Sequence, residues 1–158
     1  MKKQFTKYVF TAFCVFLLSS PGKAQNCDQL SAAQLRAMLV QLGYTVKDNN
    51  TTPGSEKYEV DNTTTTLNVP VAYELSASKN FIWLTVNLGP PSADTSVMNA
   101  ALLKQNFKIQ PCQFYITGKG NLMMGMAVEN RGVTNAILRR HTDKIIADVS
   151  STTAFWQK

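Results

Sequence analysis

Residue types that commonly carry chemistry are scarce in this sequence. Its cysteines are Cys14, Cys27 and Cys112, and His141 is its one histidine. A structural zinc site needs four nitrogen or sulfur ligands, so we expect no metal, and no pattern in the chain points to another cofactor. Cys14 lies within the first 24 residues, which we expect to be removed on export, as argued below. The two remaining cysteines would then be in an oxidising compartment, where a pair usually forms a disulfide, and we predict that Cys27 and Cys112 do so. The alternative is two free thiols.

Candidate acid–base groups do not converge either. General acid–base catalysis needs titratable side chains that meet at one point. Asp143 is near His141 in sequence, but residues two apart on a helix point in different directions. Gly118-Lys119-Gly120 lacks the surrounding pattern of a phosphate-binding loop and is typical of a tight turn. We therefore predict that the protein is not an enzyme; the alternative is a small periplasmic hydrolase whose site these patterns do not reveal.

The first 24 residues have the three parts of a secretory signal peptide. An apolar run, Tyr8–Leu18, is too short to cross a bilayer comfortably as a permanent helix. Small residues at Gly22 and Ala24 predict cleavage after Ala24, and the alternative is a retained membrane anchor. The basic residues ahead of the apolar run are Lys2, Lys3 and Lys7. We expect a periplasmic or secreted protein whose mature chain is residues 25–158.

Composition and charge describe that mature chain. Of the 158 residues, 44% are hydrophobic and 16% charged, which is typical of a single folded domain and excludes a disordered protein. The formal net charge of +6 comes largely from the signal segment. Removing four of the 16 basic residues leaves 12 against 10 acidic ones, a net charge of +2. This small excess argues against nucleic-acid binding.

Apolar periodicity predicts the elements that position these residues. Ser31 and Gln34 form a capping box, followed by a helix to about residue 42 and then Gly43. Residues 47–56 are polar and turn-rich and predict a loop. We expect strands at 58–61, 67–75, 81–88, 109–117 and 121–129, the second of them at a sheet edge or bent because of Pro70. A second helix follows Ser92 or Asp94 and carries Val97, Met98, Ala101, Leu102 and Phe107, and a third runs from Thr134 to Phe155-Trp156.

The resulting order is α-β-β-β-α-β-β-α. Hairpins imply antiparallel pairing, so we predict an α+β two-layer sandwich, with an antiparallel sheet and all helices on one face. Alternation should bring Cys112 under the helices, where residues ahead of the first helix could bring Cys27 close. The predicted core face of the sheet consists of Ile82, Leu84, Val86, Leu88, Cys112, Phe114, Ile116, Leu122, Met124, Met126 and Val128.

Several segments carry a resemblance to a known family. The most specific is Leu102-Leu103-Lys104-Gln105-Asn106, followed by a strand, a glycine turn and a second strand. With LRAMLVQLGY at 35–44, FIWLTVNLG at 81–89 and GNLMMGMAVENRGVTNAILRRHTDKII at 120–146, the chain resembles the YbjN-like branch of the type III secretion chaperone-like fold. The resemblance implies an α+β fold and a chaperone-like role, and it supplies no catalytic residues. Relatives that are secretion chaperones work in the cytosol, whereas this chain carries an export signal.

The face of the sheet that points away from the helices is the best functional candidate. Phe81, Trp83, Tyr115 and Met123 should lie there, and large apolar groups on an exposed face usually mark a binding surface. We predict a protein or peptide partner, which could be a second copy of the chain in a homodimer. The alternative is that the Phe155-Trp156 segment or a loop covers these residues. A structural envelope protein held by the Cys27–Cys112 bond is a further alternative.

Overall fold

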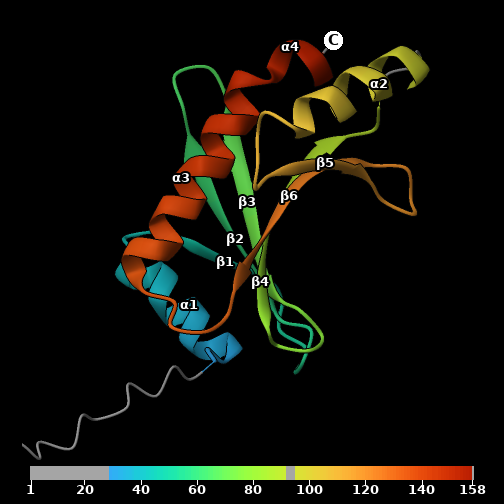
Figure 1. Cartoon of the computed structure of the whole chain (residues 1–158). Helices are drawn as coiled ribbons and strands as arrows, with labels where there is room; N and C mark the ends of the chain where they lie inside the picture. Colours follow the sequence, from blue (N-terminus) through green and yellow to red (C-terminus); the bar gives the residue numbers. More distant parts are fainter. Residues whose placement is uncertain (1–28, 92–94, 158) are drawn as a thin grey trace, which may run out of the picture.

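The computed structural model describes residues 29–91 and 95–157, and these form a two-layer α+β sandwich (Figure 1). The predicted fold class is confirmed, with an additional strand at the start and a short additional helix at the end. The helices are α1 (Ala32–Gln41), α2 (Thr95–Asn106), α3 (Asn135–Ser151) and α4 (Thr153–Trp156). The strands are β1 (Val46–Asn50), β2 (Lys57–Thr63), β3 (Asn68–Leu75), β4 (Phe81–Gly89), β5 (Gln113–Ile116) and β6 (Leu122–Glu129).

One antiparallel sheet holds all six strands in the order β1-β2-β3-β4-β6-β5. The helices lie on one side of it and leave the other side open (Figure 1). Both predicted helix starts are confirmed, because Ser31 forms its capping box with Gln34 and Thr134 caps α3 by accepting from the Ile137 N–H. The predicted caps of α2, Ser92 and Asp94, lie outside the described residues.

The prediction of a loop throughout residues 47–56 is wrong, because Val46–Asn50 pairs with β2. The strand is polar because it lies at the edge of the sheet, where its side chains form ion pairs instead of entering the core. Lys47 Nζ lies 2.5 Å from an Asp61 carboxylate oxygen, and Arg36 Nε lies 2.7 Å from Asp48 Oδ1. Pairing with a neighbouring strand thus overrides a weak intrinsic preference for extended structure.

Pro70 lies in an interior strand, although the sequence places it at an edge or a bend. β3 pairs with β2 on one side and β4 on the other, but its register with β4 begins only at Ala72. At Pro70 the strand is aligned with Asp61 of β2 alone. The absent N–H is therefore accommodated at a position that behaves locally as an edge.

The core lies between the sheet and the helices, as alternation predicts. Ile82, Leu84 and Val86 of β4 are fully or almost fully buried there, and Tyr73 joins the layers by a 2.8 Å hydrogen bond to Thr142 of α3. The prediction for Ile116 is wrong: its side chain is 45% exposed. Ile116 ends the last strand of the sheet, where the helical layer no longer covers it.

Asn130 fastens the start of the described chain to the sheet. Its side chain is fully buried, donates to the Leu30 and Lys79 carbonyl groups at 3.0 and 2.8 Å, and accepts from the Leu30 N–H at 3.1 Å. Gln29 forms an adjacent bridge with Arg131. The amide thereby satisfies backbone groups from two segments, at the end of the sheet distant from α2. Within the described ranges, the search for a helix long and apolar enough to cross a bilayer found none.

Candidate protein-binding surface

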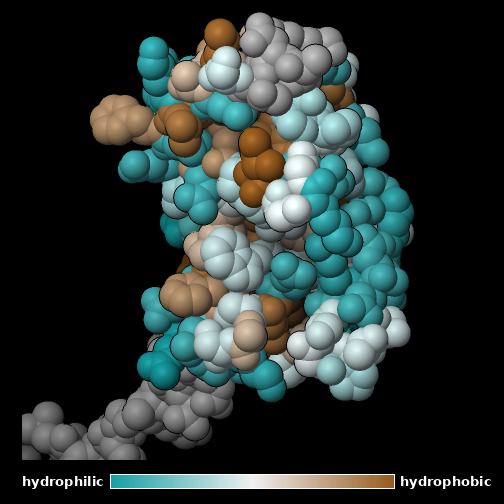
Figure 2. All heavy atoms as spheres, turned by 90° about the vertical axis from the view of Figure 1, so that its right-hand side faces the viewer, coloured by the Kyte–Doolittle hydropathy of each residue, from teal (hydrophilic) through white to brown (hydrophobic). Residues whose placement is uncertain are grey.

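The open face of the sheet is divided into a charged half and an aromatic half. In the charged half, residues of β1, β2 and β3 neutralise one another across the strands: Lys47 pairs with Asp61 and Glu59, and Lys57 lies 3.7 Å from Glu74. Figure 2 looks onto this side of the molecule, with hydrophilic side chains along its right-hand flank and hydrophobic ones along its centre and left. The apolar part of the open face therefore lies on the side of β4, β6 and β5.

The aromatic half contains the residues predicted from the sequence. Phe81 and Trp83 come from β4, and Tyr115 of β5 is aligned with Met123 of β6, so all four share the open face. Phe81 and Tyr115 are exposed, whereas Trp83 and Met123 are half-buried. The structure does not gather them into one cluster. Phe81 lies at the opposite end of β4 from Met123, since it is aligned with Glu129.

A row of small residues runs across this face between the large ones. Ala72, Thr85 and Gly125 are aligned on β3, β4 and β6. A Cβ at Gly125 would lie 3.0 Å from Tyr115 Cε1, so the absence of a side chain there lets the tyrosine ring lie over β6. Thr85 is only 6% exposed although it points to the open side. The aromatic residues on this face therefore cover its smaller ones.

Trp83 and Tyr115 border a hollow of about 400 Å³, which we call the aromatic hollow. Burial of Tyr115 and the nearby Glu74 carboxylate both raise the pKa of the tyrosine hydroxyl, burial having the larger effect. The hydroxyl of Tyr115 on β5 is therefore close enough to Glu74 on β3 for the two groups to interact electrostatically. The residues that line the hollow are Glu74, Trp83, Thr85, Gln113 and Tyr115.

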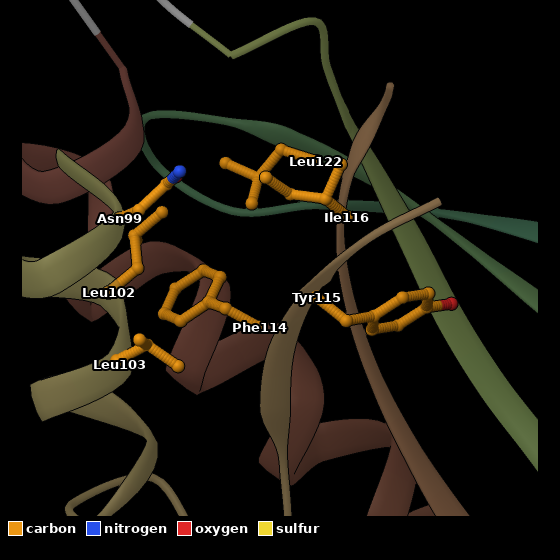
Figure 3. A pocket seen from close by; sticks show the side chains of 7 residues that line it. All are labelled: Asn99, Leu102, Leu103, Phe114, Tyr115, Ile116 and Leu122. Carbon is orange, nitrogen blue, oxygen red and sulfur yellow. The ribbon is translucent and has the colours of Figure 1, made fainter. Parts of the chain in front are cut away.

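A second hollow, of about 270 Å³, lies between α2 and β5, and we call it the α2–β5 hollow. Figure 3 shows Phe114 pointing toward α2 and Tyr115 pointing to the other side of the strand. β5 is the last strand of the sheet, so one of its sides has no neighbouring strand in the part of the chain that the structure describes. The lining residues are Asn99, Leu102, Leu103, Phe114, Tyr115, Ile116 and Leu122.

On α2 and directly after it, the structure exposes apolar residues that the sequence reasoning passed over. Leu103 is 68% exposed and Phe107 is 83% exposed, and Val97 is also largely accessible. Val97 and Phe107 therefore do not join the core, whereas Met98 and Leu102 are buried. A signal was present in the sequence: apolar residues at 97, 98, 101, 102, 103 and 107 surround the helix and exceed a single stripe.

Comparison with solved structures found a chain of the heterodimeric ExoU–SpcU complex from the type III secretion system of Pseudomonas aeruginosa. The superposition has a TM-score of 0.54 at 17% identity, and it covers 77% of this chain and 96% of the other. The chain has a secretion-chaperone-like fold. No family model matches the sequence, and no curated protein sequence matches it.

The C-terminal segment does not cover the aromatic half of this chaperone-like sheet. Phe155 and Trp156 pack against the core on the helical side, and the Trp156 indole N–H donates to the Val149 carbonyl at 3.3 Å. The alternative that this segment shields Phe81 and Trp83 is therefore wrong.

Cys112 is a buried thiol beneath the helices. Its Sγ lies 3.8 Å from Met126 Sδ, and burial, with the nearby Asp148 carboxylate, raises its pKa to about 12. Cys27 lies outside the described residues, so the Cys27–Cys112 pairing stays a prediction.

His141 is half-buried on α3, away from the open face. Burial, and secondarily the charge of Arg140, lower the pKa of its imidazole. Among residues 29–91 and 95–157, no group of three or more histidine, cysteine or acidic side chains lies close enough to hold a metal ion.

Proposed function

We propose that the protein is an exported, non-enzymatic protein-binding module of the YbjN-like family, and that it binds an extended or partly unfolded polypeptide. The observation that carries the proposal is the concentration of exposed apolar side chains around one strand. Leu103 on α2, Phe107 directly after α2, and Tyr115 and Ile116 on β5 are all accessible to solvent. Large apolar groups in such proximity usually mark an interaction surface.

The geometry of β5 indicates how a polypeptide would bind. A strand at the end of a sheet presents backbone N–H and C=O groups to an extended chain, and side-chain pockets beside it supply specificity. Here the α2–β5 hollow lies on one side of the strand and the aromatic hollow on the other. Successive side chains of an added strand point to opposite faces, so one bound segment would present side chains on both of the faces that carry the hollows.

The structural neighbour supports a protein partner. It was solved as part of a heterodimeric complex, so a chain with this fold does assemble with another protein. For the present chain the partner is a proposal, and a second copy of the chain is one outcome of the test. Export to the periplasm or beyond rests on residues 1–24 alone.

The proposal is tested with reduced, carboxymethylated α-lactalbumin, a permanently unfolded polypeptide, labelled for fluorescence anisotropy. We expect binding by the mature protein and about tenfold weaker binding by a Leu103→Ser/Ile116→Ser double variant, because truncated central apolar contacts dominate binding losses. The matched control is Val40→Ser, which removes a 50% exposed apolar side chain from α1, distant from β5.

Light scattering on the same samples determines whether the surface joins two copies. If the double variant binds as well as the wild type, or if Val40→Ser weakens binding equally, the surface around β5 is not the binding site. If none of the three proteins binds and all are monomers, the proposed function is wrong.

A further inference from the structure

The aromatic hollow indicates the chemistry of the partner, an inference that rests on the proposed function. Its walls are the rings of Trp83 and Tyr115, and Thr85 lies between them. Gly125 continues the row of small residues and leaves room for the Tyr115 ring. Glu74, aligned directly with Trp83 across β3 and β4, closes one end. Two aromatic walls, a small floor and a carboxylate thus surround one space.

The groups that line this space favour a cation. The faces of aromatic rings carry partial negative charge, and Glu74 adds a formal one. Gln113, the remaining lining residue, is uncharged, so no basic side chain lines the hollow. The nearest opposing charge is Lys57, whose Nζ lies 3.7 Å from Glu74 Oε2. Both members of that pair are partly exposed, and exposed ion pairs hold their members only weakly.

We propose that the aromatic hollow binds the cationic head of an arginine or lysine side chain carried by an extended segment of the protein partner. A cation over the face of a tryptophan or tyrosine ring is attracted to it, and the carboxylate at the end of the hollow pairs with the same group. The methylene stem of the side chain lies over Thr85. A neutral or anionic side chain would bind less tightly in the hollow, because it could not form an ion pair with Glu74, which would keep only its weak pairing with Lys57.

The experiment compares two peptides that differ only in charge: acetyl-leucyl-arginyl-leucine amide and its citrulline counterpart. Each is titrated into ¹⁵N-labelled mature protein while the indole N–H signals are followed by NMR. Trp83 reports on the hollow, and Trp156, which lies on the helical side, serves as a control within the same spectrum. We expect the Trp83 signal to shift, with about fivefold tighter binding of the arginine peptide.

Three variants test the role of the carboxylate. Glu74→Gln should reduce the preference for arginine over citrulline to less than about twofold, and Lys57→Ala should strengthen arginine binding about twofold by releasing Glu74. Glu129→Gln is the matched control, because Glu129 is an exposed acid aligned with Phe81 on the same face outside the hollow. It should leave the preference unchanged. Thermal unfolding monitored by circular dichroism shows whether each variant is folded.

Two results overturn the inference. If wild-type protein binds both peptides equally at Trp83, the hollow does not select a cation, although the proposed polypeptide-binding function is untouched. If neither peptide moves the Trp83 signal while unfolded α-lactalbumin still binds, the hollow takes no part in recognition. Failure of the α-lactalbumin experiment with retained arginine preference would instead remove the proposed function and leave a cation site.

Discussion

The two faces of the sheet are built from the same strands and differ in what covers them. On β4, Leu84 is completely buried beneath the helices, while its neighbour Trp83 points to the open side and is half-buried. Residues on the covered face pack against helices from distant parts of the sequence. Residues on the open face are covered by their neighbours on the same face. The Tyr115 ring, for example, lies over Gly125, next to the buried Thr85. The covered face therefore carries most of the stability, whereas the open face stays in contact with solvent.

The largest expected effect is the difference in stability loss between substitutions at Leu84 and at Trp83. Leu84→Ala removes a fully buried side chain and leaves a cavity, so we expect a loss of about 3 kcal/mol in the free energy of unfolding. Trp83→Ala removes a larger side chain that is already partly hydrated, and we expect a loss of about 1 kcal/mol. Guanidinium chloride unfolding of both variants measures the difference. Equal losses would show that the open face also carries the fold.

A smaller effect on stability is expected at the contact between Tyr115 and Gly125 on the open face. Gly125→Ala places a methyl group against the Tyr115 ring, and we expect a loss of about 1 kcal/mol as the ring is displaced. In a Tyr115→Ala background the same substitution should instead stabilise by about 0.5 kcal/mol, since alanine suits a strand better than glycine. A double-mutant cycle by chemical denaturation measures this reversal of sign. Additive effects would mean that Tyr115 does not rest on Gly125.

The smallest effect concerns the covering layer and its pH dependence. Burial and Arg140 lower the pKa of His141 below its ordinary value of 6.5, so the unfolded chain binds a proton more readily than the folded one. Stability is therefore full above the unfolded-state pKa and decreases as the pH falls through the folded-state pKa. We expect the wild type to lose stability between about pH 7.5 and pH 5, and His141→Gln to flatten this dependence. Denaturation midpoints across the range provide the measurement, and parallel curves for the two proteins would contradict it.

Local signals in the sequence predicted much of the fold. The Ser31 capping box, the Thr134 cap and the alternation along 81–88 are all local patterns, and each element begins or alternates where these patterns place it. β1 could not be predicted in this way, because its residues are polar and gain their extended form from pairing with β2. The exposure of Ile116 depends on where the helical layer ends, and a local sequence pattern does not contain that information.

The candidate site was predictable only in part. Alternation placed the aromatic residues on the open face, but their separation along β4 and the contact of Tyr115 with Gly125 depend on strand register. The exposed side of α2 was overlooked because apolar residues in a helix are ordinarily assigned to the core. A helix with apolar residues on several sides, next to the final strand of a sheet, indicates that some of these residues are exposed to solvent.

The hydrogen bonds of the Asn130 side chain also bear on the order of events during synthesis. Its hydrogen bonds join residues that are 100 positions apart, so the N-terminal end of the domain cannot be secured until residue 130 has been made. Contacts of such long sequence separation form slowly because a large loop must close first. A chain that emerges from the ribosome N-terminus first therefore completes this end of the domain only late in its translation.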